Sequence, residues 1–308
     1  MTTSVGSGDE HVRPISKLGF DYPIEPGITI VVPVYNAFYE LDVCIESLLA
    51  HAAGHRRILF IDDCSSDRRI WPRLRAVAED NPGVEALLHT NNQGYTRTIN
   101  HGCQLAGADD VVLLNCDTVV TTGWLEKLVR ASESAPNVAT VTPLSNAAGA
   151  FSVPVNHRSN RLPPGLSPTE MAELVEELSD QIYPRVPTGN GFCLFVRRAA
   201  LEVVGPFDDR TFPHGCGEEN DFCLRASRLG FIHLVDDTNY IFHHRSASLG
   251  WRKRFLLLTS ALKLRIRYPE YRPMVAAWLE DDPLDPLRQR MRLRLGKGLT
   301  ATGPDKPD

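Results

Sequence analysis

The feature that most constrains the fold of this chain is a short run of apolar, mostly β-branched residues from Ile28 to Val34. A run of this kind is typical of a strand buried on both faces, as in a parallel sheet. Similar runs recur between segments with helical periodicity. Strands are also predicted at residues 57–61, 84–88 and 110–114, with helices at residues 41–50, 71–80 and 96–106. This alternation predicts an α/β fold, with a mostly parallel sheet flanked by helices on both faces.

The second half of the chain is less regular. Residues 143–168 are rich in Pro, Asn, Ser and Gly, which predicts a long loop. Further helices are predicted at residues 170–178, 221–230 and 250–267, and a strand at residues 191–196. We expect three parts: a flexible N-terminal arm at residues 1–27, an α/β domain at residues 28–250, and a helical, basic C-terminal extension and tail at residues 251–308.

Charge and cysteine usage exclude several classes of protein. The net charge of -5 argues against nucleic-acid binding, which usually needs a basic surface. The N-terminus lacks a basic segment followed by an apolar one, and no apolar run approaches the about 20 residues that span a bilayer. The seven cysteines form no C-x-x-C pair, and several lie in apolar runs, which is typical of a reducing compartment. We expect a cytoplasmic protein, or one attached peripherally at the inner face of a membrane.

Polar residues follow the first four predicted strands. Because the carboxyl ends of parallel strands share one edge of a sheet, these clusters are expected to lie together. An aromatic ring there can stack on a base, one acid can bind the base or ribose, and another can hold a metal on the phosphates. Each cluster alone is an ordinary turn, so the ordered set carries the prediction. The clusters are residues 33–36, 62–67, 91–94 and 115–118.

The order and spacing of these clusters resemble those of the family 2 glycosyltransferases of the GT-A fold. The resemblance runs from about Ile28 to Ser248, most of the chain. Its four elements are Val32-Pro-Val-Tyr-Asn36, Ile61-Asp-Asp-Cys-Ser-Ser-Asp67, Asn92-x-Gly94 with Asn100-x-Gly102, and Leu113-Leu-Asn-Cys-Asp-Thr118. It implies a GT-A domain that binds a nucleotide-sugar.

The resemblance also implies residues for the donor. Pro33 and Tyr35 are expected to line the base pocket, and Asp63 to contact a uracil-type edge or the ribose. An ordinary half-buried aromatic is the simpler interpretation of Tyr35 taken alone. The other residues implied for the nucleotide-sugar site are Asn92, Gly94, Asn115, Asn190 and Gly191. The last two belong to a stretch of small residues that lets the backbone approach a sugar closely.

The family's Asp-x-Asp metal motif reads Asn115-Cys-Asp117 in this chain. The resemblance implies a Mn²⁺ or Mg²⁺ ion held by Asp117 and the donor diphosphate, since these ions prefer oxygen ligands. Asn115 is expected to orient Asp117 or to contact the ribose. The late element Ile241-Phe-His-His-Arg-Ser-Ala-Ser248 implies that His243 completes the metal site. Two partly exposed loop histidines are the alternative interpretation of that element.

The segment Gly215-Cys-Gly-Glu-Glu-Asn-Asp-Phe-Cys-Leu-Arg225 resembles the family's catalytic motif, in which Glu219 matches the base. Direct displacement at an anomeric carbon needs a base that takes the proton of the acceptor hydroxyl. Three acids within four positions are expected to raise one another's pKa, which suits that role. Acids also enrich the first turn of any helix, and we prefer this interpretation for Asp221.

The resemblance implies an enzyme, an inverting glycosyltransferase that moves a hexose or deoxyhexose from a UDP- or dTDP-sugar. The expected acceptor is a hydroxyl of a glycan or of a lipid-linked acceptor in cell-surface polysaccharide synthesis. A non-catalytic nucleotide-sugar-binding protein is the alternative, supported by Asn115 in the metal motif. A dehydrogenase lacks support because no Gly-x-Gly-x-x-Gly follows the first strand. A nucleotidyltransferase would need a Gly-rich basic loop at that point.

The C-terminal part is strongly basic. Residues 245–297 carry a net charge of +8 in a chain whose total is -5. Apolar, basic helices of this kind can lie on anionic membrane surfaces. A helix packed on the domain with its basic face in solvent explains the same sequence. Both interpretations stay open, and peripheral membrane contact through this segment is one of them.

Overall fold

The structure is a computed structural model that describes residues 27–52, 57–244 and 250–296, with side chains in the last range from residue 256. The predicted arm at residues 1–27 lies outside the described residues except for Gly27. The end of the late histidine element, residues 245–248, also lies outside them.

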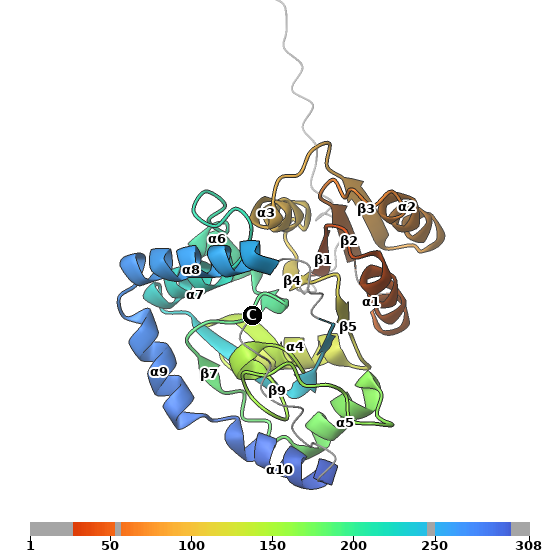
Figure 1. Ribbon diagram of the computed structural model, residues 1–308. Helices are drawn as coiled ribbons and strands as arrows, with labels where there is room; N and C mark the ends of the chain where they lie inside the picture. Colours follow the sequence, from red (N-terminus) through yellow and green to blue (C-terminus); the bar gives the residue numbers. More distant parts are fainter. Residues whose placement is uncertain (1–26, 53–56, 245–249, 297–308) are drawn as a thin grey trace, which may run out of the picture.

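A single eight-stranded sheet forms the centre of the domain (Figure 1), in the order β3-β2-β1-β4-β8-β6-β9-β7. The strands are β1 (Ile28–Val34), β2 (Arg57–Asp62), β3 (Val84–Leu88), β4 (Asp110–Leu114), β6 (Val138–Leu144), β7 (Arg185–Val186), β8 (Cys193–Val196) and β9 (Ile232–Tyr240). The first four strands are mutually parallel. Strand β8 runs antiparallel to both of its neighbours, β4 and β6, and β7 runs antiparallel to β9. The sheet is therefore mixed, with its parallel half built from the first half of the chain.

Helices cover both faces of the sheet, because alternate residues of each buried strand point to opposite sides. On β1, Ile30 and Val32 belong to an apolar cluster that extends to α1, α2, α4, α5 and α10, whereas Val31 belongs to a second cluster with residues of α3, α6 and α7. The helices are α1 (Phe38–His51), α2 (Ile70–Asp80), α3 (Tyr95–Leu105), α4 (Trp124–Glu133), α5 (Pro168–Leu178), α6 (Arg198–Val204), α7 (Glu218–Arg228), α8 (Gly250–Arg267), α9 (Tyr271–Asp281) and α10 (Asp285–Leu295). The predicted α/β fold with flanking helices and C-terminal helices is confirmed.

A small two-stranded sheet lies beside the main one. It pairs β5 (Thr118–Val119) with β10 (Phe242–His243) in antiparallel register, with His243 opposite Thr118. The pairing brings the end of the domain sequence next to the residues that follow β4.

The structure adds elements that the sequence patterns did not predict, among them α4, β6 and β9. Strand β9 is the clearest case, because Asp236, Asp237, Thr238 and Asn239 are all buried in it. These polar residues are typical of turns, but each of the four side chains has a hydrogen-bond partner, although Asp236 Oδ2 and Asn239 Oδ1 have none among the described residues. The Asp237 carboxylate, for example, accepts hydrogen bonds from the Ser179 hydroxyl at 2.7 Å and a backbone N–H at 2.9 Å.

Residues 145–167 form the long loop that was predicted, with a 3₁₀ turn at Gly149–Phe151. Asn160 fixes the loop internally, since its side-chain amide donates to the carbonyls of Asn146 at 3.0 Å and Val155 at 2.8 Å. A capping box at Ser167 then starts α5. The loop is thus anchored near both of its ends.

The C-terminal helices pack on the domain. Leu264 of α8 and Tyr268, which directly follows the helix, share a small apolar cluster with Phe212 and Leu224, and so join α8 to α7. Helix α10 enters the main core through Leu287 and Met291, together with Leu284 at its N-cap. The proposed boundary at residue 250 stays a prediction, although apolar packing crosses it.

Arg288 joins α10 to the long loop. Its guanidinium is buried and donates to the carbonyl of Ser152 at 3.0 Å, to the carbonyl of Ala150 and to the Asp282 carboxylate. Other cations of α10 are paired with acids, in Arg290–Asp180, Arg292–Asp285 and Arg294–Glu177 pairs. For α10, the structure therefore favours the packed helix over a helix on a membrane.

Within the described ranges, no helix combines the length and the apolarity needed to cross a membrane.

The buried guanidinium should matter far more to stability than the exposed cations of the same helix. We expect Arg288→Ala to lower the free energy of unfolding by about 3 kcal/mol, because it leaves two buried carbonyls and one carboxylate without their donor. Arg294→Ala is the matched control, since its side chain is largely exposed and its ion pair is long, at 3.6 Å. Urea unfolding of the two variants measures the difference, and equal stability of both would contradict this role of Arg288.

Candidate functional site

The ends of β1, β2 and β4 lie at one edge of the sheet because these strands are parallel neighbours. Strand β8 is antiparallel to β4, so its beginning lies at the same edge, with Cys193 opposite Leu114. The backbone N–H of Asn115 donates to the carbonyl of Phe192 at 2.9 Å. Two segments that are far apart in sequence, residues 115–118 and 188–192, therefore meet at this edge.

The turn after β1 is fixed to the turn after β2. The Asn36 side-chain oxygen accepts the backbone N–H groups of Ser66 and Asp67, each at 3.0 Å, and the Ser65 hydroxyl accepts the N–H of Asn36. Tyr35 projects from this turn and is 55% exposed. Pro33 lies within β1, opposite Ile61, and is buried. Of the two residues implied for the base pocket, Tyr35 offers an accessible ring and Pro33 lies beneath the surface.

Asp63 holds the loop that follows β3. Its carboxylate accepts the backbone N–H of Gln93 at 2.7 Å and of Gly94 at 2.9 Å, and its carbonyl accepts the Asn92 side-chain amide at 3.0 Å. His89 lies 2.9 Å from the same carboxylate. A carboxylate has about four acceptor positions, so one remains for a ligand. Asn92 and Gly94 thus belong to the site through their bonds to Asp63.

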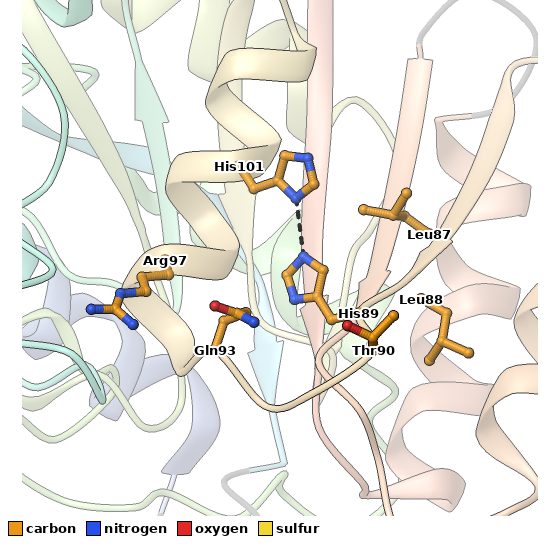
Figure 2. A pocket seen from close by; sticks show the side chains of 7 residues that line it. All are labelled: Leu87, Leu88, His89, Thr90, Gln93, Arg97 and His101. Carbon is orange, nitrogen blue, oxygen red and sulfur yellow. Dashed lines mark hydrogen bonds between the residues drawn. The ribbon is translucent and has the colours of Figure 1, made fainter.

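Behind Asp63, two histidine rings are stacked. His89 Nε2 and His101 Nδ1 are 3.0 Å apart, and the rings lie side by side in Figure 2. Since His89 Nδ1 faces a carboxylate, it carries the proton, and Nε2 then accepts from His101. Burial and the neighbouring ring lower the pKa of His101, which favours this neutral arrangement. The pair lines an open cavity of about 440 Å³ with the end of β3 and the start of α3.

Asp117 and His243 form the pair expected to hold a metal ion. The β5–β10 pairing places them together, with His243 Nε2 at 3.2 Å from Asp117 Oδ1. His243 Nδ1 lies 3.2 Å from the carbonyl of Ala147, which can only accept, so Nδ1 carries a proton. In the neutral imidazole, Nε2 then directs a lone pair at a carboxylate oxygen. An imidazole nitrogen and a carboxylate oxygen at this distance can share a cation, either a proton or a metal ion.

This donor set fits an ion that is completed by its substrate. In the part of the chain that the structure describes, no three His, Cys, Asp or Glu side chains converge as a ready-made metal site. One carboxylate and one imidazole leave several positions for the oxygens of a diphosphate and for water, which is how Mg²⁺ usually binds. The residues present therefore suit Mn²⁺ or Mg²⁺ bound with a phosphorylated ligand.

An acidic pair begins α7. The backbone N–H of Gly217 donates to both Glu218 Oε2 and Glu219 Oε2, each at 3.1 Å. Burial, and after it the charge of Glu219, raises the pKa of Glu218. Burial also raises the pKa of Glu219. Because Glu218 is buried and Glu219 is partly exposed, we infer that a shared proton rests on Glu218 and that Glu219 is the accessible carboxylate.

Gly191 faces this acidic pair. A Cβ atom built on Gly191 would lie 3.8 Å from Glu218 Oε1 and 3.8 Å from the Glu219 carboxyl carbon, so a side chain here would stand in front of the pair. Asn190 is a supporting residue in this structure. Its side-chain oxygen accepts the N–H of Phe192 at 3.2 Å and its amide donates to the carbonyl of Ala148 at 3.3 Å.

Asp221 is separate from this pair, although it is only two residues from Glu219. It is fully buried and accepts from Arg225, Arg267 and the Tyr268 hydroxyl at 2.8, 2.6 and 2.7 Å. The preferred interpretation of Asp221 as a structural acid agrees with these contacts. Of the three acids that were expected to act on one another, only Glu218 and Glu219 form the pair.

Tyr95 and Asn146 were missed by the sequence patterns. The Tyr95 hydroxyl lies 3.3 Å from the carbonyl of Gly191, to which it donates, and 3.5 Å from Asn115 Oδ1. Tyr95 therefore joins the two halves of the site, and Asn115 is directed toward it. Asn146 accepts the backbone N–H of His243 at 2.7 Å and donates to its carbonyl at 3.0 Å. Its place in a polar loop gave no signal of this role.

Comparison with known proteins gives a family match over more than half of the chain. Residues 29–205 match the family described as "Glycosyl transferase family 2". A curated relative from Mycobacterium tuberculosis, an N-acetylglucosaminyl-diphospho-decaprenol L-rhamnosyltransferase, is 27% identical over 249 residues, which cover 72% of this chain and 79% of that protein. The chain spans only 36%, 12% and 29% of the length of three other curated relatives, among them an uncharacterized glycosyltransferase of Haemophilus influenzae.

Two solved structures share the fold at low sequence identity. GalNAc-T7 with UDP, GalNAc and Mn²⁺ has a TM-score of 0.60 at 15% identity, covering 87% of this chain and 55% of that one. The mannosyltransferase PcManGT from Pyrobaculum calidifontis, in complex with GDP-Man and Mn²⁺, has a TM-score of 0.56 at 17% identity. This match covers 89% of the present chain and 77% of the mannosyltransferase. These likenesses establish the architecture.

The role of Asp63 in holding the loop can be tested without a ligand. We expect Asp63→Asn to lower the free energy of unfolding by about 1–3 kcal/mol, because its amide would turn a donor toward buried N–H groups. Asp67→Asn is the matched control in the same turn, since Asp67 pairs with Arg69 at the surface. Thermal unfolding should separate the two variants. Asp63→Asn with the stability of wild type would show that the loop does not depend on this carboxylate.

Proposed function

Because the chain belongs to glycosyl transferase family 2, we propose that it transfers a sugar from a nucleotide-sugar to a hydroxyl of a glycan or lipid-linked acceptor. The observation that carries this proposal is the acidic pair at the start of α7, which faces Gly191 at the edge that also holds Asp63 and the Asp117–His243 pair. A base, a nucleoside-binding acid and a cation site at one edge are the groups that such a transfer requires.

For the donor, we propose a UDP- or dTDP-sugar. The exposed ring of Tyr35 is available to stack on the base, and the remaining acceptor position of Asp63 is available for an N–H of the base or a hydroxyl of the ribose. Pro33 supports this pocket from within β1. Asn92 and Gly94 keep Asp63 in place. Asn115, which lies near the Tyr95 hydroxyl after the end of β4, would contact the ribose.

For the cofactor, we propose Mn²⁺ or Mg²⁺ on Asp117 and His243. When bound, such an ion would neutralise the diphosphate that leaves with the nucleotide. The opposed acceptors at 3.2 Å support a cation at this point. Asn146 holds the backbone of His243, so it acts as a positioning residue. Both solved structures with this fold were determined with Mn²⁺, which makes it the first ion to test.

In the proposed reaction, Glu219 acts as the base of a single displacement. The acceptor oxygen forms a bond to the anomeric carbon while the bond from that carbon to the diphosphate oxygen breaks, which inverts the anomeric configuration. The acceptor proton passes to the Glu219 carboxylate. Glu218, which we infer to keep its own proton, hydrogen-bonds Glu219 and prevents a second charge from forming beside it.

For the acceptor, we propose a lipid-linked glycan of a cell-surface polysaccharide. The M. tuberculosis relative is named for a sugar carried on diphospho-decaprenol and aligns over most of both chains. The reaction would then take place in the cytoplasm at the inner face of a membrane, with peripheral contact through the basic C-terminal part. A nucleotide-sugar-binding protein without turnover is the alternative, favoured by Asn115 in place of an acid.

The acidic pair gives a sharp test of catalysis. We expect Glu219→Gln to lower kcat by about 10²–10⁴-fold, because it removes the base. Glu218→Gln should lower kcat less than about tenfold, since an amide resembles the protonated acid. The acidic limb of the pH profile should lie above pH 4.5, the ordinary pKa of glutamate, because a protonated Glu219 cannot accept a proton. Release of nucleotide from a UDP-sugar, with and without acceptor, measures all three effects.

Unchanged UDP binding by both variants is the control for folding. Equal losses of kcat in the two variants would contradict the division of roles between Glu218 and Glu219. No turnover by wild type with any donor, despite nucleotide binding, would favour the non-catalytic alternative.

The metal and donor sites can be tested together by calorimetric titration with UDP, dTDP and GDP, with and without Mn²⁺. We expect UDP or dTDP to bind only with the ion. Asp117→Ala should abolish this metal-dependent binding, and His243→Ala should weaken it roughly tenfold or more. His244→Ala is the matched control, because its ring packs on Phe242 and is not an expected ligand. Equally tight nucleotide binding with and without metal would overturn the cation site.

A further inference from the structure

The outer face of α8 carries a row of large apolar side chains in contact with solvent. Leu258, Leu262 and Ile266 are 72%, 58% and 73% exposed. Their spacing of four residues places them along one side of the helix. Contiguous exposed apolar residues of this kind are uncommon on a protein that has no partner at that face. We call these three residues the α8 row.

The α8 row cannot turn inward, because the opposite side of the helix is fixed to the domain. Ser260, Leu264 and Tyr268 are buried there. Arg267 binds Asp221 at 2.6 Å, which holds the end of α8 against α7. The Lys263 ammonium donates to the carbonyl of Thr211 at 2.7 Å, which holds its middle. The exposure of the row is therefore a property of the fold.

The charge around the α8 row is positive. Arg265 is exposed on the same side of the helix, between Leu262 and Ile266 in sequence. The sequence adds three consecutive cationic residues, 252–254, in the first turns of α8. The cations of α10, in contrast, are paired with acids of the domain or of α10 itself. A helix that combines an apolar row with basic residues is suited to bind an anionic lipid surface.

Helix α8 lies close to the acidic pair at the start of α7, and a cavity adjoins the helix there. Leu256, Thr259 and Lys263 line a cavity of about 240 Å³ with the segment 211–215. At Gly215 that segment approaches the acidic pair, since a Cβ built there would lie 3.8 Å from Glu218 Oε1. On the helix, the residues that line the cavity adjoin the α8 row. The side of the molecule next to the proposed base is therefore the side that carries the row.

We propose that the α8 row, with the cations of α8, docks the protein on an anionic phospholipid surface. The docked orientation presents the 211–215 cavity to the lipid, so that the sugar end of a lipid-linked acceptor has a short path to Glu219. The proposal rests on the proposed function only for this acceptor. Docking itself requires neither the donor nor turnover, and α8 rather than α10 is the element that makes it.

The test is sedimentation of the full chain with vesicles. We expect binding to phosphatidylglycerol–phosphatidylcholine vesicles and little to phosphatidylcholine alone. The triple variant Leu258→Gln, Leu262→Gln, Ile266→Gln should bind the anionic vesicles at least about tenfold more weakly. The matched control replaces three comparably exposed apolar residues elsewhere, Ile182, Val203 and Leu229, by Gln and should bind as wild type does.

Calorimetric titration with nucleotide shows whether each variant is folded and separates docking from chemistry. Vesicle binding that depends on the α8 row supports the proposal even if no sugar is transferred. Failure of wild type to bind anionic vesicles, or equal binding by the triple variant, overturns it. Sedimentation velocity tests whether a second copy of the chain occupies this face instead. A wild-type dimer that becomes a monomer in the triple variant, without a change in vesicle binding, would assign the α8 row to contact between two copies.

Discussion

The buried carboxylate of Asp221 fixes the position of α7 relative to α8. The side of the molecule where the acceptor is proposed to enter depends on this arrangement. Removing a charge from water is costly unless donors replace the water. Here Arg225, Arg267 and Tyr268 supply those donors, the last two from the end of α8 and the residue that follows it. The interaction holds the start of α7 against the end of α8. The acidic pair and the exposed face of α8 therefore keep one fixed geometry relative to each other.

The same helix turn contains acids in two opposite environments. Asp221 has its negative charge compensated by two guanidinium groups. Glu218 and Glu219 have a backbone N–H from Gly217, and no Lys or Arg of the described residues forms an ion pair with them. Burial thus raises the pKa of Glu218 and of Glu219. Asp221, in contrast, has a structural role. Environment, and not residue type, separates the proposed base from the structural acid beside it.

The first half of the fold was readable from the sequence because its strands are parallel and buried on both faces. Strands such as β1 and β4 then appear as unbroken apolar runs, and the residues after them fall at one edge. Strand β9 was not readable, since its buried Asp237 and Asn239 have partners that only the finished fold brings near, Ser179 and Trp124. Tyr95 and Asn146 were missed for a related reason. Their roles depend on contacts with Gly191 and His243, which are about a hundred residues away.

The loop between β6 and α5 shows how proteins with this site could come to differ. It is clamped near its start by Arg288 and by Asn160, and at its end by the Ser167 capping box. The cost of closing a loop grows only with the logarithm of its length, about 0.6 kcal/mol for each doubling. Insertions between the clamps would therefore leave the sheet and the acidic pair undisturbed. Such a segment is free to diversify by insertion and deletion while the chemical centre is inherited unchanged.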